Sequence, residues 1–109
     1  MVEKLKALAE PHRLEILRLI RYREMPAGDI ASHFNATRPA ISQHLRVLRD
    51  ADLITERREG TRRLYRLHPK GFQELRAFLS EFWDEHLAAL KQAAEQSHKG
   101  QYDHKRTGT

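Results

Sequence analysis

The chain of 109 residues contains no cysteine. This absence excludes disulfide bridges, cysteine-ligated zinc, iron–sulfur clusters and thiol catalysis. No stretch approaches the ~18 consecutive apolar residues of a membrane span, and the first residues carry acids where a signal peptide has its apolar core. We therefore expect a cytoplasmic protein with no membrane partner.

Enzymatic signatures are also missing. We find no glycine-rich phosphate loop, no paired carboxylates with a cleft to hold them, and no nucleophile beside a base. A chain of 109 residues has room for one hydrophobic core but not for two. The sequence therefore predicts a protein that is not an enzyme, with no catalytic residue and no cofactor.

Positive charge is unevenly distributed. The formal net charge is +5, from 20 Lys and Arg against 15 Asp and Glu. Residues 35–70 hold nine of these cations against four acids, and eight of the nine are arginine. Arginine makes bidentate contacts with phosphate and guanine. The middle of the chain therefore favours a surface that binds a polyanion over a uniformly basic exterior.

Apolar spacing predicts four helices, then two strands, then a long helix. The expected ranges are 2–9, 11–23, 26–34 and 37–50 for the first helices, 53–58 and 62–67 for the strands, and 72–97 for the last helix. Pro11 fits the first turn of its helix, and Thr37 is a good N-cap. We expect one domain over residues 1–97 and a disordered polar tail over 98–109.

This order of elements predicts a winged helix-turn-helix. The helices at 26–34 and 37–50 are separated by only two or three residues, which is the spacing of a helix-turn-helix. The basic hairpin that follows supplies the wing. The fold class is therefore mainly α with a small β-hairpin, in the order α-α-α-α-β-β-α.

The helix at 37–50 has the composition of a DNA-reading element. Ile41, Leu45 and Leu48 define its inward side, and polar or cationic residues cover the opposite side. The N-terminal residues of a recognition helix meet base edges, while flanking residues grip the backbone. We assign Arg38, Ser42 and Gln43 to bases, and Thr37, Arg46 and Arg49 to phosphates. His44 lies towards the core edge, where a partly buried structural role is expected.

The hairpin carries four arginines around Gly60. They are Arg57, Arg58, Arg62 and Arg63. Guanidinium groups of this density suit a narrow minor groove or its phosphates. Charged side chains also protect an exposed strand edge, and the two roles are compatible.

The segments ALAEPHRLEILRLI (7–20), AGDIASHFNATRPAISQHLRVLRDADLI (27–54) and RREGTRRLYRL (57–67) resemble the ArsR-type winged helix repressors. The resemblance implies binding to double-stranded operator DNA as a homodimer, with the first and last helices forming the dimer interface. The inducer remains unknown.

Two ion-sensing sites of that family are lost here. Pro26 and Gly28 stand where one site has its thiolates, and Pro69, Gly71, Phe82 and Glu85 stand at the four positions of the other. We therefore predict no metal site of the family's kind. Asp84, His86 and His98 leave open a metal-responsive repressor with a different set of ligands.

The last helix has apolar residues on more than one face, which favours a second copy of the chain over a monomer. The expected dimer contacts are Leu5, Leu8, Leu79, Phe82, Trp83, Leu87 and Leu90. The sequence thus predicts a homodimeric, sequence-specific repressor that binds an inverted repeat. The alternative is a winged-helix module that binds acidic proteins, which the arginine clusters disfavour.

Overall fold

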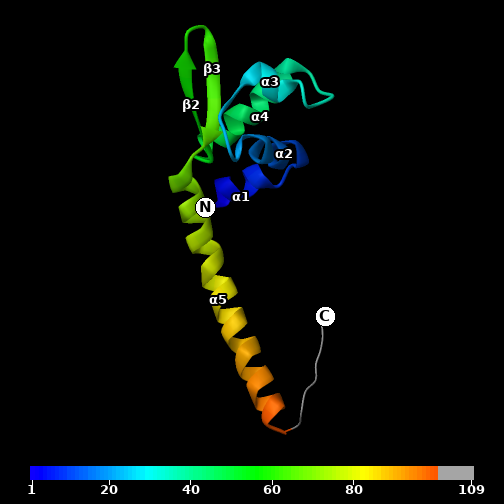
Figure 1. Ribbon diagram of the computed structural model, residues 1–109, viewed down its shortest axis with the longest axis vertical. Helices are drawn as coiled ribbons and strands as arrows, with labels where there is room; N and C mark the ends of the chain where they lie inside the picture. The colour runs from blue at the N-terminus through cyan, green and yellow to red at the C-terminus, as the bar shows by residue number, and fades with distance from the viewer. Residues whose placement is uncertain (101–109) are drawn as a thin grey trace. The chain divides into compact units, whose positions relative to one another are not determined.

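The computed structural model describes residues 1–100, apart from the side chains of Asp84, Glu85 and 97–100. The chain divides into two compact units, Met1–Arg76 and the segment that begins at Ala77. The elements are α1 (Val2–Leu8), α2 (Pro11–Ile20), β1 (Met25–Pro26), α3 (Ala27–Ala31), α4 (Arg38–Asp50), β2 (Ile54–Glu59), β3 (Arg62–Leu67) and α5 (Pro69–Gly100). Figure 1 labels all of them except β1. The predicted winged helix-turn-helix is confirmed.

Both ends of the last helix differ from the sequence prediction, and α2 ends at Ile20 instead of residue 23. Helix α5 begins at Pro69 and extends to Gly100, so residues 98–100, which we expected in the tail, are helical. The rest of the predicted tail, residues 101–109, lies outside the described residues. The single domain expected over residues 1–97 stays a prediction, since the two units divide at Arg76.

A third strand was missed. We expected Pro26 to open a helix, but Met25 and Pro26 form β1, which pairs antiparallel with Tyr65 and Leu64 of β3. The sheet order is β1-β3-β2, so β1 is an edge strand, where a proline without an N–H is tolerated. Helix α3 consequently starts one residue later than expected, and it ends at Ala31 instead of residue 34.

The core of the first unit fixes the orientation of α4. Ile41, Leu45 and Leu48 are buried, as the helical spacing predicts. The largest fully buried side chains are Ile16, Ile20, Ile30, Ile41, Leu48, Leu53 and Ile54, from α2, α3, α4, the turn after α4, and β2. Because apolar burial on one side holds α4 in place, its polar side must face solvent. No helix within the described residues is long and apolar enough to cross a membrane.

A tight turn joins α4 to the wing. The Leu53 N–H donates to the Leu48 carbonyl at 3.0 Å, and the Asp52 N–H donates to the Arg49 carbonyl at 2.9 Å. This is the Schellman arrangement, in which the residue after the helix takes a left-handed conformation. Here that residue is Asp52, with φ of 61°. The turn sends the chain directly into β2 and so sets where the wing begins.

Asp52→Ala is expected to lower the free energy of unfolding by about 1 kcal/mol, because alanine adopts a positive φ less readily than Asp does. Asp52→Gly should be no less stable than the original chain. Asp50→Ala is the matched control, since Asp50 is exposed and helical. Urea unfolding measures all three. Equal stability of the two alanine variants would contradict the role of the turn.

Candidate nucleic-acid interface

The start of α4 is fixed by its cap. The Thr37 hydroxyl accepts a hydrogen bond from the Ala40 N–H at 3.2 Å, which confirms the predicted N-cap. Pro39 lies in the first turn, where its missing N–H leaves no helical bond unmade. The cap therefore places the first exposed side chains of α4 at a defined position.

The exposed side of α4 carries the residues assigned to DNA. Arg38, Ser42, Gln43 and Arg46 are all exposed. Among the described residues, neither Arg38 nor Arg46 takes part in an ion pair. Their guanidinium groups are therefore available to a ligand without losing a carboxylate partner.

Arg49 lies in a different environment from Arg46. Its guanidinium donates to the carboxylate of Glu56 on β2, and Arg63 approaches the other oxygen of Glu56 at 3.5 Å. The hydrogen bond from Arg49 and the negative charge of Glu56 raise the pKa of Arg49. A phosphate contact by Arg49 stays a prediction, but in this structure Arg49 joins α4 to the wing.

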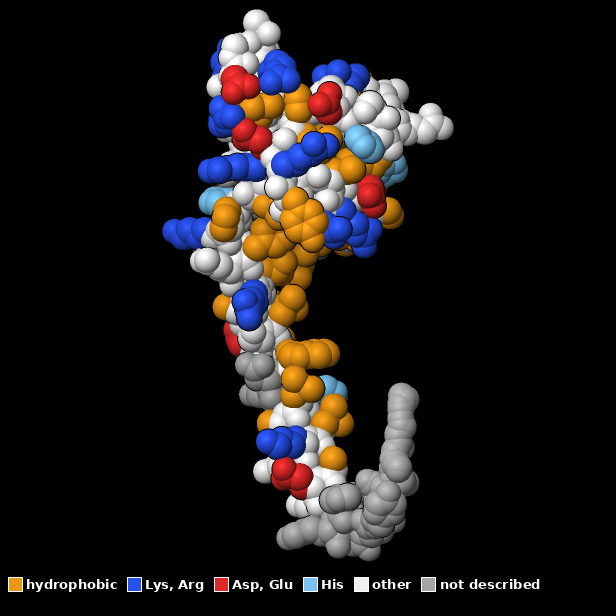
Figure 2. All heavy atoms as spheres, in the orientation of Figure 1, with side chains coloured by type: hydrophobic (Ala, Val, Ile, Leu, Met, Phe, Trp, Pro, Cys, Tyr) orange, Lys and Arg blue, Asp and Glu red, His pale blue; other side chains and the backbone are white. Residues whose placement is uncertain are grey.

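Acidic side chains accompany the arginines of the wing, and Figure 2 shows both signs of charge over this part of the first unit. The pairs are Arg57 with Glu24 and Glu59, Arg62 with Glu59, and Arg63 with Glu56. Arg58 has no ion pair among the side chains that the structure describes. Exposed pairs of this kind contribute little stability, so a phosphate can replace the carboxylate at small cost.

Glu24 is the partner that the sequence analysis overlooked. Nε of Arg57 donates to Oε2 of Glu24 at 3.0 Å. This hydrogen bond from Arg57 lowers the pKa of Glu24. Glu24 precedes β1, which pairs with β3 of the wing. The sequence prediction lacked β1, so it could not place Glu24 beside Arg57.

A hollow of about 500 Å³ brings α4 and the wing together. Its lining includes Arg38 and Ser42 from α4, and Arg62 and Arg63 from β3. Helix α3 closes it, since a β-carbon at Gly28 would lie 3.7 Å from the guanidinium of Arg38. Two predicted base-reading residues and two wing cations therefore share one surface, although they are far apart in the sequence. Gln43, Arg57 and Arg58 do not line this hollow.

His44 is partly buried, as predicted. NH1 of Arg13 donates to its Nδ1 at 3.3 Å, and its ring stacks on His12 with an interplanar angle of 8°. His44 therefore helps to pack α4 against α2. Of the looser metal candidates, His86 is exposed on α5, while the side chains of Asp84 and His98 lie outside the described part.

A second feature is an apolar stripe on α5 in the unit that begins at Ala77, visible as hydrophobic side chains along that helix in Figure 2. We define it as Leu79, Phe82, Trp83, Leu87 and Leu90, which are all exposed. Trp83 is 62% exposed, and Phe82 is 60% exposed and contacts Phe78 edge-on. In α1, Leu5 is exposed, but Leu8 packs partly buried against the core of the first unit.

Residues 10–56 match the family described as "Bacterial regulatory protein, arsR family". The matched segment contains α2, β1, α3, α4 and the start of β2. It therefore covers the helix-turn-helix and the turn into the wing.

Individual relatives match a larger part of the chain. The HTH-type transcriptional regulator Rv2034 of Mycobacterium tuberculosis is 39% identical over 80% of this chain and 81% of that protein. The transcriptional repressor SdpR of Bacillus subtilis is 42% identical over 63% of this chain and 77% of that protein. A possible transcriptional regulator for arsenical resistance, known from a crystal structure, is 42% identical with a TM-score of 0.69, over 82% of this chain and 97% of that one.

Proposed function

Because this chain belongs to the ArsR family of bacterial regulatory proteins, we propose that it is a DNA-binding repressor that acts as a homodimer on an inverted-repeat operator. It is a transcriptional regulator and not an enzyme. The observation that carries the proposal is the hollow between α4 and β3, because it joins Arg38 and Ser42 at the start of α4 to Arg62 and Arg63 of the wing.

In this proposal α4 enters the major groove. Arg38, Ser42 and Gln43 face the base edges, where glutamine suits adenine and arginine suits guanine. Thr37 and Arg46 hold phosphates on either side. The wing arginines reach the adjacent minor groove or its backbone, and they exchange their exposed carboxylate partners for phosphate oxygens.

The dimer is the second part of the proposal. The apolar stripe on α5 and the exposed side chain of Leu5 support it, because monomeric proteins rarely expose contiguous apolar surface of this kind. A two-fold dimer presents two copies of α4 to successive major grooves, ~34 Å apart along the duplex. With no cysteine in the chain, any ion that released this repressor from DNA would need other ligands.

Gln43→Ala and Arg46→Ala are expected to affect DNA binding differently. Gln43→Ala should lower discrimination at one base pair by roughly ten- to a hundredfold, since a bidentate base contact contributes ~1–3 kcal/mol. Arg46→Ala should weaken binding to every sequence. It should also reduce the slope of log K against log salt by ~0.9 for each phosphate that the variant no longer neutralises.

The measurement uses an operator selected from a random duplex library, followed by fluorescence anisotropy at several salt concentrations. Arg18→Ala is the control, because Arg18 is an exposed cation of α2 that pairs with Glu15 and lies outside the proposed interface. Gln43→Ala and Arg46→Ala proteins that bind like the Arg18→Ala control would contradict the assigned surface.

A further inference from the structure

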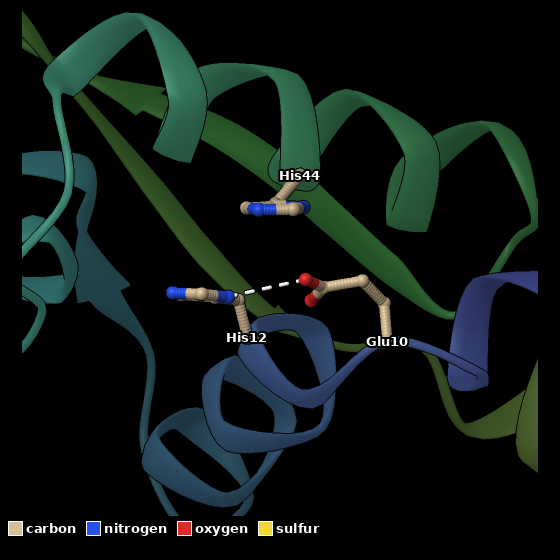
Figure 3. A group of neighbouring side chains, drawn as sticks. All are labelled: Glu10, His12 and His44. Carbon is tan, nitrogen blue, oxygen red and sulfur yellow. Dashed lines mark hydrogen bonds and ion pairs between the residues drawn. The ribbon is translucent and has the colours of Figure 1, made fainter.

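Three side chains that can each bind a metal ion converge between α2 and α4 (Figure 3). They are Glu10, His12 and His44, and one ligand atom from each lies within 4.8 Å of the other two. Glu10 and His12 belong to the start of α2, whereas His44 lies in the middle of α4. The fold therefore brings together groups that are far apart in the sequence.

The carboxylate of Glu10 is held in place by the helix that it caps. Its Oε1 accepts from the Arg13 N–H at 3.1 Å, and its Oε2 lies 3.1 Å from Nδ1 of His12. His12 packs against two rings, with His44 stacked at 5.3 Å and Phe34 tilted at 5.6 Å between centroids. These contacts hold Glu10 and His12 in position before a metal ion binds.

The protonation states of Glu10 and His44 suit a cation. Desolvation lowers the pKa of His44, and the positive charge of Arg13 lowers it further, against the opposing effect of Glu10. Desolvation acts to raise the pKa of Glu10, but hydrogen bonds from the His12 side chain and the Arg13 backbone outweigh it, so the pKa is lowered. At neutral pH the group offers a neutral imidazole on α4 and an ionised carboxylate, the forms that bind metals.

We propose that Glu10, His12 and His44 form a binding site for one Zn²⁺-type dication. Two imidazoles and one carboxylate are a common donor set for zinc, and water fills the fourth position. Metal–ligand bonds of about 2.0–2.2 Å place neighbouring donors ~3.3 Å apart in a tetrahedral site. The Glu10–His12 pair is already close to that spacing. The ring of His44 is stacked parallel to that of His12, so His44 must rotate out of the stack to direct a nitrogen at the same ion.

Arg13 is the group that opposes this binding. Its NH1 donates to Nδ1 of His44 at 3.3 Å, so a metal at that nitrogen requires this hydrogen bond to break. The other guanidinium nitrogens of Arg13 keep their acceptors, since Nε donates to the Ala7 carbonyl at 2.7 Å and NH2 donates to the Lys6 carbonyl at 3.2 Å. Arg13 therefore remains anchored when it releases His44, at the loss of one bond.

The site lies next to the proposed reading surface. His44 directly follows Gln43 in α4, and the ion would tie the start of α2 to this helix. This consequence rests on the proposed function, whereas the metal site itself does not. Metal binding is therefore measured in the absence of DNA.

The untagged chain of 109 residues is titrated with ZnCl₂ in the presence of a competing chelator dye, and with CoCl₂ by visible absorption. We expect one equivalent of each metal per chain, and visible bands of a site with nitrogen and oxygen ligands. His12→Gln and His44→Gln should each weaken Zn²⁺ binding at least tenfold. Glu10→Gln should also weaken it, although glutamine can still cap α2 through its side-chain oxygen.

His33→Gln is the matched control, because His33 is exposed and outside the group. Unchanged binding in His33→Gln, together with loss in His12→Gln, supports the site. The proposed site would be overturned if His12→Gln and His44→Gln both bound Zn²⁺ as tightly as the unsubstituted chain. It would also be overturned if His33→Gln no longer bound one equivalent of Zn²⁺. Thermal unfolding without metal checks that each variant is folded, and Zn²⁺ should raise Tm only where the site is intact.

Discussion

The Gly71→Ala variant is expected to lose about 3 kcal/mol of stability or more, the cost of forcing extra volume into a packed interior. A β-carbon at this position would lie 1.8 Å from the carbonyl oxygen of Asp52 and 2.9 Å from its carbon. Both are backbone atoms, so no side-chain rotation relieves the clash. For a chain of this size the loss corresponds to a decrease in Tm of roughly 10–20 °C.

The position explains why the contact is so close. Gly71 lies in the first turn of α5, against the turn that ends α4. The His68 N–H donates to the Leu53 carbonyl at 3.0 Å, so the chain is already held to this turn just before the helix begins. To accommodate alanine, the start of α5 must move away from the turn, and the hydrogen bond at His68 must lengthen with it.

Two other glycines serve as controls. Gly28→Ala places a β-carbon at ordinary contact distance from Arg38, within α3, and should be neutral or stabilising by up to about 1 kcal/mol. Gly60 has φ of +65° but open space around it, so Gly60→Ala should cost only the conformational strain of about 1 kcal/mol. Calorimetry of the three variants should show the largest loss at Gly71. A Gly71→Ala variant as stable as Gly28→Ala would contradict the close packing of α5 on the turn.

Helix α4 shows which features the sequence specifies well. Its N-cap at Thr37, the proline in its first turn and its buried Ile41, Leu45 and Leu48 were all predicted from neighbouring residues. Capping and helical periodicity depend on positions within a few residues of each other. The structure confirms both ends of this helix, as well as the hairpin after it.

The features that were missed depend on residues far apart in the sequence. Strand β1 has only two residues and exists because it pairs with β3, and Pro26 on its own is equally typical of a helix start. His12 and His44 meet only once α2 packs on α4. Likewise, a count of charges cannot show that Glu24 lies against Arg57. Tertiary packing creates these contacts, so no local pattern reveals them.

Trp83→Glu is expected to convert the proposed dimer into a monomer and to weaken operator binding by roughly a hundredfold or more, because two linked half-sites gain 10²–10⁴ in avidity over one. Trp83 is the largest exposed side chain in the stripe of Leu79, Phe82, Trp83, Leu87 and Leu90. These residues recur at steps of three and four, so they lie along one side of α5. A glutamate in the stripe would bury a charge in the proposed apolar contact, and the cost of desolvating that charge opposes association.

Sedimentation at micromolar concentration measures the mass, and fluorescence anisotropy on the selected operator measures the affinity. Tyr22→Glu is the control, since Tyr22 is an exposed aromatic residue outside the stripe, and this variant should remain dimeric.

The two measurements separate dimerisation from DNA recognition. A monomer binds one half-site, so its salt dependence should be about half that of the dimer, because it neutralises half as many phosphates. The Arg46→Ala variant should instead remain dimeric, and it should lose only the proposed phosphate contact of Arg46 on each chain. The proposed dimer would be contradicted if the unsubstituted chain sedimented as a monomer and still bound the full operator at high affinity. A single copy of α4 and the wing would then have to supply that affinity.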